Sequence, residues 1–136
     1  MRSTIVGILA AALLAAAGYL MITTPWQQGG EVVLELTGDR SVELEAGREL
    51  VVELDENPTT GYIWKYVISP KGIVVPAGSD FSRDEAPAGM VGVGGTRVFR
   101  FKAAYAGEVS ITFSESRPWE EGIPPVREFT LKARVK

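Results

Sequence analysis

Residues 107–114 read Gly-Glu-Val-Ser-Ile-Thr-Phe-Ser, and from Val109 to Phe113 every second residue is apolar while the residues between are polar. This alternation has the period of a β-strand, in which successive side chains point to opposite faces of a sheet. One face of the strand is therefore buried and the other faces water. The pattern recurs from Glu31 onward and predicts seven strands, with these inward-facing sets: Val32, Leu34 and Leu36; Val42 and Leu44; Leu50, Val52 and Leu54; Tyr62, Trp64, Tyr66 and Ile68; Phe99, Phe101 and Ala103; Val109, Ile111 and Phe113; Phe129, Leu131, Ala133 and Val135.

Turn-forming residues separate these runs, as at 37–40 and 106–108, and no apolar stripe with helical spacing occurs after residue 30. The pattern predicts an all-β fold, an immunoglobulin-like antiparallel β-sandwich of about seven strands, with Trp64 packed between the sheets. A closed barrel is the alternative architecture. Residues 69–95 are rich in Pro, Gly and Ala, and only residues 73–75 within them resemble a further strand.

The composition limits the function. The chain has 136 residues, with no histidine and no cysteine. Because Arg2 is the only charge before Glu31, residues 31–136 carry 13 basic and 17 acidic residues, a net charge of −4. An acidic domain without a Lys/Arg run is a poor partner for nucleic acid or for an anionic membrane surface. A domain of about 106 residues buries enough surface to fold without disulfides or metal.

The N-terminal segment differs from the rest of the chain. Residues 5–22 carry no charge and follow the single basic residue Arg2. A helix of this length spans about 27 Å, near the minimum for a membrane span, with Arg2 on the cytoplasmic side. We therefore expect residues 1–23 to be a signal peptide or a membrane anchor helix, and residues 24–30 a linker. The domain at 31–136 is then periplasmic, extracellular or held on the outer face of the membrane. Alanines at 15–17 offer a cleavage site but the apolar run continues past them, so cleavage and retention both stay open.

Three motifs fall between the expected strands, where a β-sandwich displays its loops. The first is Asn57, Pro58, Thr59, Thr60, Gly61 and Tyr62; the second is Gly92, Val93, Gly94 and Gly95; the third is Arg117, Pro118 and Trp119. Without His or Cys the domain lacks the usual acid–base residue and the thiol nucleophile, so these loops are expected to bind and not to catalyse. We predict no catalytic residue, no metal site and no cofactor.

The first motif is expected to form a stiff turn. Pro58 fixes its own φ and favours extended geometry at Asn57, while Gly61 tolerates a positive φ. The tip presents two hydroxyls and no charge, which suits insertion into a narrow, partly apolar cleft, because a charged tip would suffer a desolvation cost. A plain Pro-Gly hairpin turn is the alternative.

The glycines of the second motif precede a strand pattern and lack the lysine of a phosphate-binding loop, which argues against phosphate binding. They permit close backbone approach to another surface, with Val93 as the projecting side chain. A flexible connection is the alternative.

In the third motif, Trp119 lies on a proline-braced loop and is either a contact residue or a core residue turned inward. Trp and Arg are the residue types most enriched at interface hot spots, which favours contact. The neighbouring acid pairs, at 120–121 and at 55–56, are expected to be solvated surface charge.

Together, in this order and on a predicted immunoglobulin-like sandwich, the three motifs resemble those of the chagasin family of cysteine protease inhibitors. The family pattern is Asn-Pro-Thr-Thr-Gly-aromatic, Gly-x-Gly-Gly and Arg-Pro-Trp, and this sequence matches each part. The resemblance implies a reversible, competitive, monomeric inhibitor of papain-like cysteine proteases, and not an enzyme. It implies that Thr59 and Thr60 face the protease's Cys-His centre, that residues 92–95 lie on the non-primed side, and that Trp119 reaches the primed side.

Two other functions remain open on the residues alone. One is a cell-surface immunoglobulin-like adhesion or structural module, and the other is an exported enzyme that uses hydroxyls and carboxylates. The long approach at residues 79–90 and the acid pair after Trp119 depart mildly from the family pattern and bear on which protease is preferred.

Overall fold

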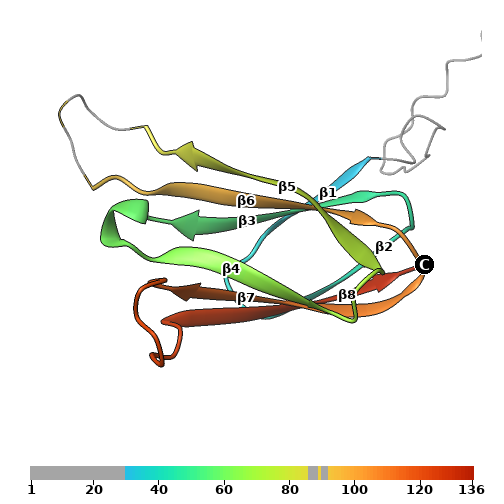
Figure 1. Ribbon diagram of the computed structural model, residues 1–136. Helices are drawn as coiled ribbons and strands as arrows, with labels where there is room; N and C mark the ends of the chain where they lie inside the picture. The colour runs from blue at the N-terminus through green and yellow to red at the C-terminus, as the bar shows by residue number, and fades with distance from the viewer. Residues whose placement is uncertain (1–29, 86–88, 90–91) are drawn as a thin grey trace, which may run out of the picture. The chain divides into compact units, whose positions relative to one another are not determined.

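The computed structural model describes residues 30–85, 89 and 92–136. The leader predicted at residues 1–23 and nearly all of the linker lie outside the described residues. Glu31–Lys136 form one compact unit of eight strands in two four-stranded sheets that pack face to face (Figure 1). Each sheet has two free edges, so the sandwich prediction is confirmed and the closed barrel is wrong. Within the described ranges, no helix is long and apolar enough to cross a membrane.

The first sheet contains, in spatial order, β1 (Glu31–Glu35), β3 (Glu49–Glu56), β6 (Gly95–Ala103) and β5 (Val74–Arg83). The second contains β2 (Arg40–Leu44), β8 (Arg127–Val135), β7 (Gly107–Ser116) and β4 (Ile63–Ser69). The alternating residues of both sheets meet between them, and Trp64 is buried there as predicted. Each large apolar side chain removed from water contributes about 1.5–3 kcal/mol.

Aromatic rings fill the centre of this core. Tyr66 lies edge-on to Phe99 and Phe101, with ring centroids 5.0 Å apart in both pairs. Phe99 also stacks on Phe113 across the sandwich, at 5.8 Å. Such pairs add about 0.5–1.5 kcal/mol beyond the area that they bury. They join the two sheets in a domain that has no disulfide.

Both sheets are mixed and not antiparallel, so this part of the sequence prediction is wrong. β1 runs parallel to β3, with Glu31 beside Glu49, and β2 runs parallel to β8, with Arg40 beside Leu131. The turn predicted at residues 37–40 does reverse the chain, but its two arms pair in different sheets. Alternation reports which face of a strand is buried, and it carries no information on the direction of the neighbouring strand.

The part of the chain that the structure describes has eight strands and not seven, because β5 occupies residues that the sequence pattern left almost without structure. Of its ten residues only Val74 is buried. β5 is an edge strand, and its pairing with β6 shifts in register between Pro76 and Gly78. A bulge of this kind disturbs an exposed edge and so protects it from pairing with other chains. A strand without a buried face shows no apolar alternation, which is why only residues 73–75 suggested it.

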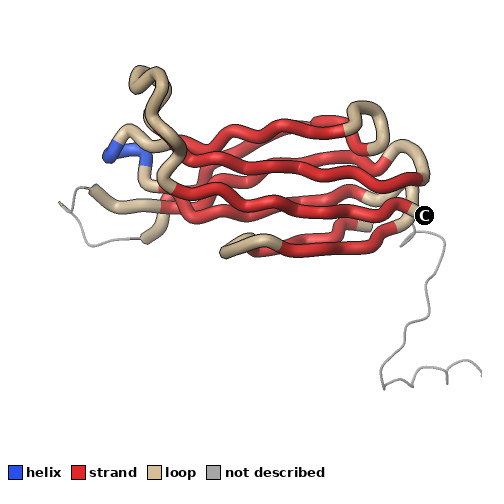
Figure 2. The backbone as a smooth tube through the Cα atoms, turned by 90° about the horizontal axis from the view of Figure 1, so that it is seen from below, coloured by secondary structure: helices blue, strands red, loops and turns tan. Residues whose placement is uncertain are grey.

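The topology brings three connections to one end of the sandwich. β3, β5 and β7 all end there, so residues 57–62, 84–85, 92–94 and 117–126, which are the described parts of the connections to β4, β6 and β8, lie at this end (Figures 1 and 2). The two ends of the domain lie at the opposite end, since Glu31 pairs with Glu49 and Val135 with Gly107. All three predicted motifs therefore share one end of the domain.

Candidate functional site

The first motif folds into one turn of 3₁₀ helix, Pro58–Thr60, capped at both ends. The Asn57 side chain accepts hydrogen bonds from the Thr59 backbone N–H (3.2 Å) and from the Thr59 hydroxyl (2.6 Å). The Asn57 carbonyl accepts from the Thr60 hydroxyl (2.7 Å). Gly61 ends the turn at φ +87°, a conformation that other residues rarely adopt. The stiff turn is confirmed, and both hydroxyl protons at its tip are used inside the loop.

The second motif packs directly against the first. Asn57 Nδ2 donates to the Gly92 carbonyl at 2.8 Å. A Cβ on Gly94 would lie 3.3 Å from the Glu56 carbonyl, and a Cβ on Gly95 would collide with the Ser82 carbonyl of β5. The predicted close backbone approach therefore exists, but at these two glycines it is made to the protein's own first loop and to β5. Val93 is half-buried.

The third motif packs against the other side of the first. Arg117 Nε donates to the Thr60 carbonyl at 3.1 Å, and its guanidinium lies 4.3 Å from the centre of the Tyr62 ring. The Trp119 indole rests on Gly61, where an added Cβ would collide with the ring. Trp119 nevertheless remains 67% exposed, so the alternative in which it turns into the core is wrong.

A buried ion pair lies under the first and second loops. Glu56, only 2% exposed, accepts two hydrogen bonds from Arg97 through one carboxylate oxygen (3.0 and 2.8 Å). Its other oxygen accepts from the backbone N–H of Trp64 (2.9 Å). This carboxylate thus joins both ends of the first loop to β6, close to the second loop. The expectation that Glu56 is solvated surface charge is wrong, because burial of a carboxylate requires this pairing.

A second arginine joins the roots of the first and third loops. Arg127 donates to Glu115 (2.7 and 3.1 Å) and to the Asp55 carboxylate (3.0 and 3.3 Å), and it lies 5.1 Å from the centre of the Trp64 ring. Trp64 Nε1 donates to the Asp55 carbonyl (2.8 Å). Hydrogen bonds from Arg127 to Glu115, and secondarily to Asp55, raise the pKa of Arg127 above its ordinary value. The guanidinium therefore keeps its charge at any pH at which the domain is used.

The sequence analysis did not identify the four inward-facing charged residues of these ion pairs, although their positions in the strand pattern indicate burial. Glu56 continues the inward series of β3, Glu115 that of β7, Arg97 that of β6 and Arg127 that of β8. A charged residue at an inward-facing position near a strand end indicates a buried ion pair. The acid pair at 120–121 does remain at the surface, where Glu120 pairs with Arg117 at 3.4 Å.

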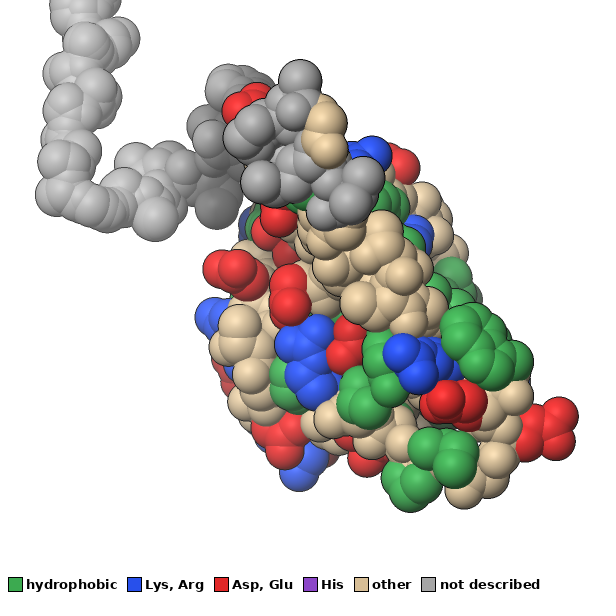
Figure 3. Space-filling model, turned by 90° about the vertical axis from the view of Figure 1, so that its left-hand side faces the viewer, with side chains coloured by type: hydrophobic (Ala, Val, Ile, Leu, Met, Phe, Trp, Pro, Cys, Tyr) green, Lys and Arg blue, Asp and Glu red, His purple; other side chains and the backbone are tan. Residues whose placement is uncertain are grey.

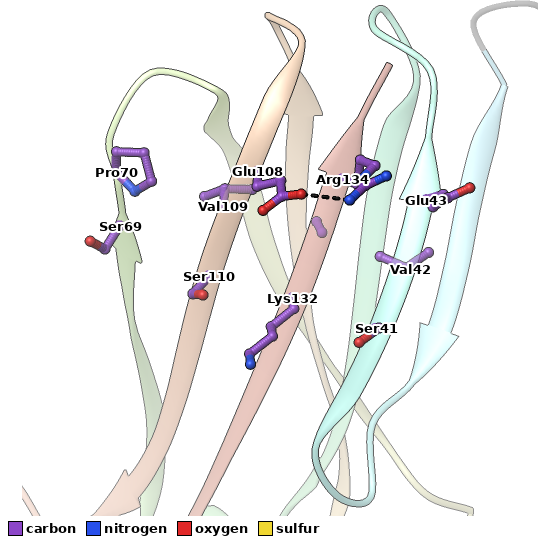
Figure 4. Close-up of a pocket in the computed structure, with 11 residues that line it drawn as sticks. Ser41, Val42, Glu43, Ser69, Pro70, Glu108, Val109, Ser110, Lys132 and Arg134 are labelled. Carbon is purple, nitrogen blue, oxygen red and sulfur yellow. Dashed lines mark hydrogen bonds and ion pairs between the residues drawn. The ribbon is translucent and has the colours of Figure 1, made fainter.

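The three motifs together form the site, and we call them the ridge because no cavity lies among them: residues 57–62, 92–95 and 117–119. Seen from the loop end, acidic and basic side chains lie next to one another near the centre, and apolar side chains gather toward one side (Figure 3). A hollow of about 660 Å³ opens elsewhere, on the outer face of the second sheet, in the half of the strands away from the loops (Figure 4). Its lining is mixed, with Val42 and Pro70 beside Lys132 and the Glu108–Arg134 ion pair. Across the described residues, no group of His, Cys, Asp or Glu could hold a metal.

A sandwich that presents three loops braced against one another by hydrogen bonds is suited to binding another protein through those loops. Residues 43–133 match the model of the Chagasin family peptidase inhibitor I42, and the chain therefore belongs to the chagasin family. This is a family of inhibitors and not of enzymes.

Two curated relatives come from Entamoeba histolytica. Amoebiasin-2 is 31% identical over 85 residues, which cover 62% of this chain and 68% of that protein. Amoebiasin-1 is 30% identical over 106 residues, which cover 76% of this chain and 100% of that protein. The crystal structure of the cysteine protease inhibitor EhICP2, from the same organism, is similar with a TM-score of 0.71 and 25% identity, and the match covers 79% of this chain and 96% of that one.

Proposed function

We propose that this protein inhibits papain-like cysteine proteases reversibly and competitively, by placing the first loop over the catalytic cysteine and the other two loops on either side of the cleft. The observation that carries the proposal is the cross-bracing of the three motifs. Asn57 bonds to Gly92, and Arg117 bonds to Thr60, so the loops form one continuous ridge. Loops held in place before binding lose little conformational entropy on docking.

The shape of the first loop supports inhibition without cleavage. Residues 58–60 are a helical turn closed by hydrogen bonds from the Thr60 and Gly61 backbone N–H groups, at 3.1 and 2.9 Å. A scissile peptide must instead reach a near-attack geometry at the nucleophile. Such a turn fills the cleft while its peptide bonds stay outside that geometry.

The chemistry of the tip suits a thiolate–imidazolium centre. Thr59 and Thr60 both direct their hydroxyl protons toward Asn57. The outward surface of the tip therefore offers hydroxyl oxygens as acceptors together with methyl groups, and it carries no charge. Papain-like enzymes hold a cysteine thiolate beside a histidine, whose N–H groups need acceptors. In this arrangement residues 92–95 lie on the non-primed side and Trp119 on the primed side.

We also propose that residues 1–23 export the domain, either as a cleaved signal or as a retained anchor. The domain begins at Glu31, at the end opposite the loops, and the eight-residue strand β3 spans about 26 Å between the two ends. An N-terminal attachment would therefore leave the ridge accessible. Cell fractionation with N-terminal sequencing tests this. A mature protein that starts near residue 18 and is soluble contradicts the anchor, and a full-length cytoplasmic protein contradicts export.

The test of the inhibitory function is a titration of papain with residues 31–136, with trypsin as the control enzyme. We expect papain activity to fall stoichiometrically at high enzyme concentration and trypsin activity to remain unchanged. Folded domain at micromolar concentration that leaves papain fully active would contradict the proposal and favour an adhesion or structural module.

A further inference from the structure

The third loop carries more exposed apolar surface than its motif accounts for. Seven large hydrophobic side chains are exposed among the described residues, and three of them lie on this one loop: Trp119 at 67%, Ile123 at 57% and Val126 at 54%. The other four are scattered over β1, β4, β5 and the turn after β6: Val33, Val67, Val75 and Tyr105. Single exposed hydrophobic residues are ordinary, but a cluster on one loop marks an interaction site.

Folding does not require Ile123 and Val126 to be apolar. Trp119 rests on Gly61, whereas neither Ile123 nor Val126 belongs to the hydrophobic core or to the partly buried residues packed against it. Both lie on the returning limb of the loop, residues 122–126, with two exposed prolines between them. A polar side chain at either position would leave the sandwich unchanged.

The returning limb is held in a fixed position. Pro124 and Pro125 fix two consecutive φ angles. The Val126 N–H donates to the Glu115 carbonyl at 2.9 Å, and the next residue is Arg127, which is bound to Glu115 and Asp55. An apolar surface held in this way loses little entropy when a partner covers it.

We propose that Ile123 and Val126, on the same loop as Trp119, form a second apolar contact, and that this contact binds the surface of the papain-like protease next to the primed side of its cleft. This inference rests on the proposed function.

The size of the interface supports this occupant. A stable protein–protein interface buries about 800 Å² and about 20–30 residues on each side. The three motifs supply thirteen residues, of which Gly95 is buried in the domain. A protease that grips the motifs must therefore contact further residues. The returning limb is continuous with the motif limb, and Glu120 and Glu121 at its bend provide the polar rim that surrounds an apolar contact.

The test compares serine substitutions at matched exposed positions in the full domain, with papain as the probe. Ile123→Ser and Val126→Ser together should raise the inhibition constant by about tenfold or more, mainly through faster dissociation. Val67→Ser, at a residue 68% exposed on β4, and Tyr105→Ser, at the turn after β6, are the controls and should leave it unchanged. Melting temperatures of all variants should stay close to that of the wild type.

Each outcome decides the proposal. If wild type inhibits papain and the double variant inhibits equally well, the inference is overturned while the proposed function stands. An equal loss in the controls overturns it also, since the effect is then not specific to the limb. If wild type does not inhibit papain, the proposed function fails and the inference fails with it. Should the double variant lose stability, the single variants Ile123→Thr and Val126→Thr replace it, and unchanged inhibition by both again overturns the proposal.

Discussion

The substitution Glu56→Gln tests whether the buried ion pair under the loops holds the site together. The amide keeps the size of the carboxylate but removes its charge and replaces one acceptor with a donor. If the amide oxygen faces Arg97, the NH₂ group faces the Trp64 backbone N–H, which the second carboxylate oxygen now satisfies at 2.9 Å. One buried donor is then left without an acceptor.

The expected loss follows from these contacts. An unsatisfied buried donor costs about 1–3 kcal/mol, and breaking one partner of a buried ion pair costs about 3–5 kcal/mol in total. Because Arg97 is 25% exposed and regains some hydration, we expect about 3 kcal/mol of lost unfolding free energy. In a domain of this size that lowers the melting temperature by roughly 12–24 °C. Papain inhibition should weaken by at least about tenfold under conditions where the variant stays folded, a loss of about 1.4 kcal/mol, since both ends of the first loop lose an anchor.

Urea denaturation followed by Trp fluorescence measures the free energy of unfolding, and titration of papain measures the strength of inhibition. Glu53→Gln is the matched control, because Glu53 lies on the same strand, is only partly buried, and should change stability by less than about 0.5 kcal/mol. Adding Arg97→Met to Glu56→Gln should recover part of the loss, since neither charge is then left alone. Equal stability of Glu56→Gln and Glu53→Gln would show that the buried ion pair does not stabilise the domain.

Five further substitutions, of which Gly47→Ala and Trp64→Ala are controls, test the three loops and the ion pairs beneath them. Gly61→Ala and Gly47→Ala both place a side chain at positive φ (+87° and +94°) and should each cost about 1–2 kcal/mol of stability. Only Gly61→Ala also collides with Trp119, so only it should weaken papain inhibition; equal inhibition by the two variants would contradict the contact. Trp119→Ala should weaken inhibition by about 2 kcal/mol, roughly 30-fold, with little change in melting temperature. Trp64→Ala should cost about 3–5 kcal/mol of stability, and a similar melting loss for both Trp variants would mean that Trp119 supports the fold. Arg127→Met leaves Glu115 buried without its cation and should cost about 3 kcal/mol in urea denaturation, and a loss below 0.5 kcal/mol would show that the pair is not needed.

Much of the fold was predictable from the sequence, because its signals are local. The alternation identified the buried faces of the central strands, and the inward-facing residues are buried as predicted: Phe99, Phe101, Val109, Ile111 and Phe113. Tyr66, which packs against them, is only partly buried. Pro58 and Gly61 likewise favour their turn through local backbone geometry, and the Asn57 side chain caps it from within the same motif. These predictions depend only on neighbours in the chain.

What the sequence did not reveal depends on partners that are distant in the chain. β1 pairs in parallel with β3, and β2 pairs in parallel with β8, because the two arms of one turn enter different sheets. No local sequence pattern indicates this. β5 lies at an edge where nearly every side chain meets water.

The charged residues beneath the loops are an intermediate case. Each of Glu56, Arg97, Glu115 and Arg127 sits at an inward-facing position, which is a signal in the sequence that the prediction of solvated surface charge at residues 55–56 did not use. Only the sheet registers show which acid meets which arginine, since Glu115 lies opposite Arg127 in the pairing of β7 with β8. Glu56 and Arg97 also lie on two strands that pair with each other, β3 and β6, so their contact likewise follows from the sheet and not from the local sequence.

If the three loops occupy the protease cleft as one unit, the domain and a peptide substrate compete for the same site, and steady-state kinetics of papain at several fixed concentrations of the domain detect this competition. We expect the apparent KM for a peptide substrate to rise linearly with inhibitor concentration while kcat stays constant. A fall in kcat at unchanged KM, or no inhibition by folded domain, would contradict it.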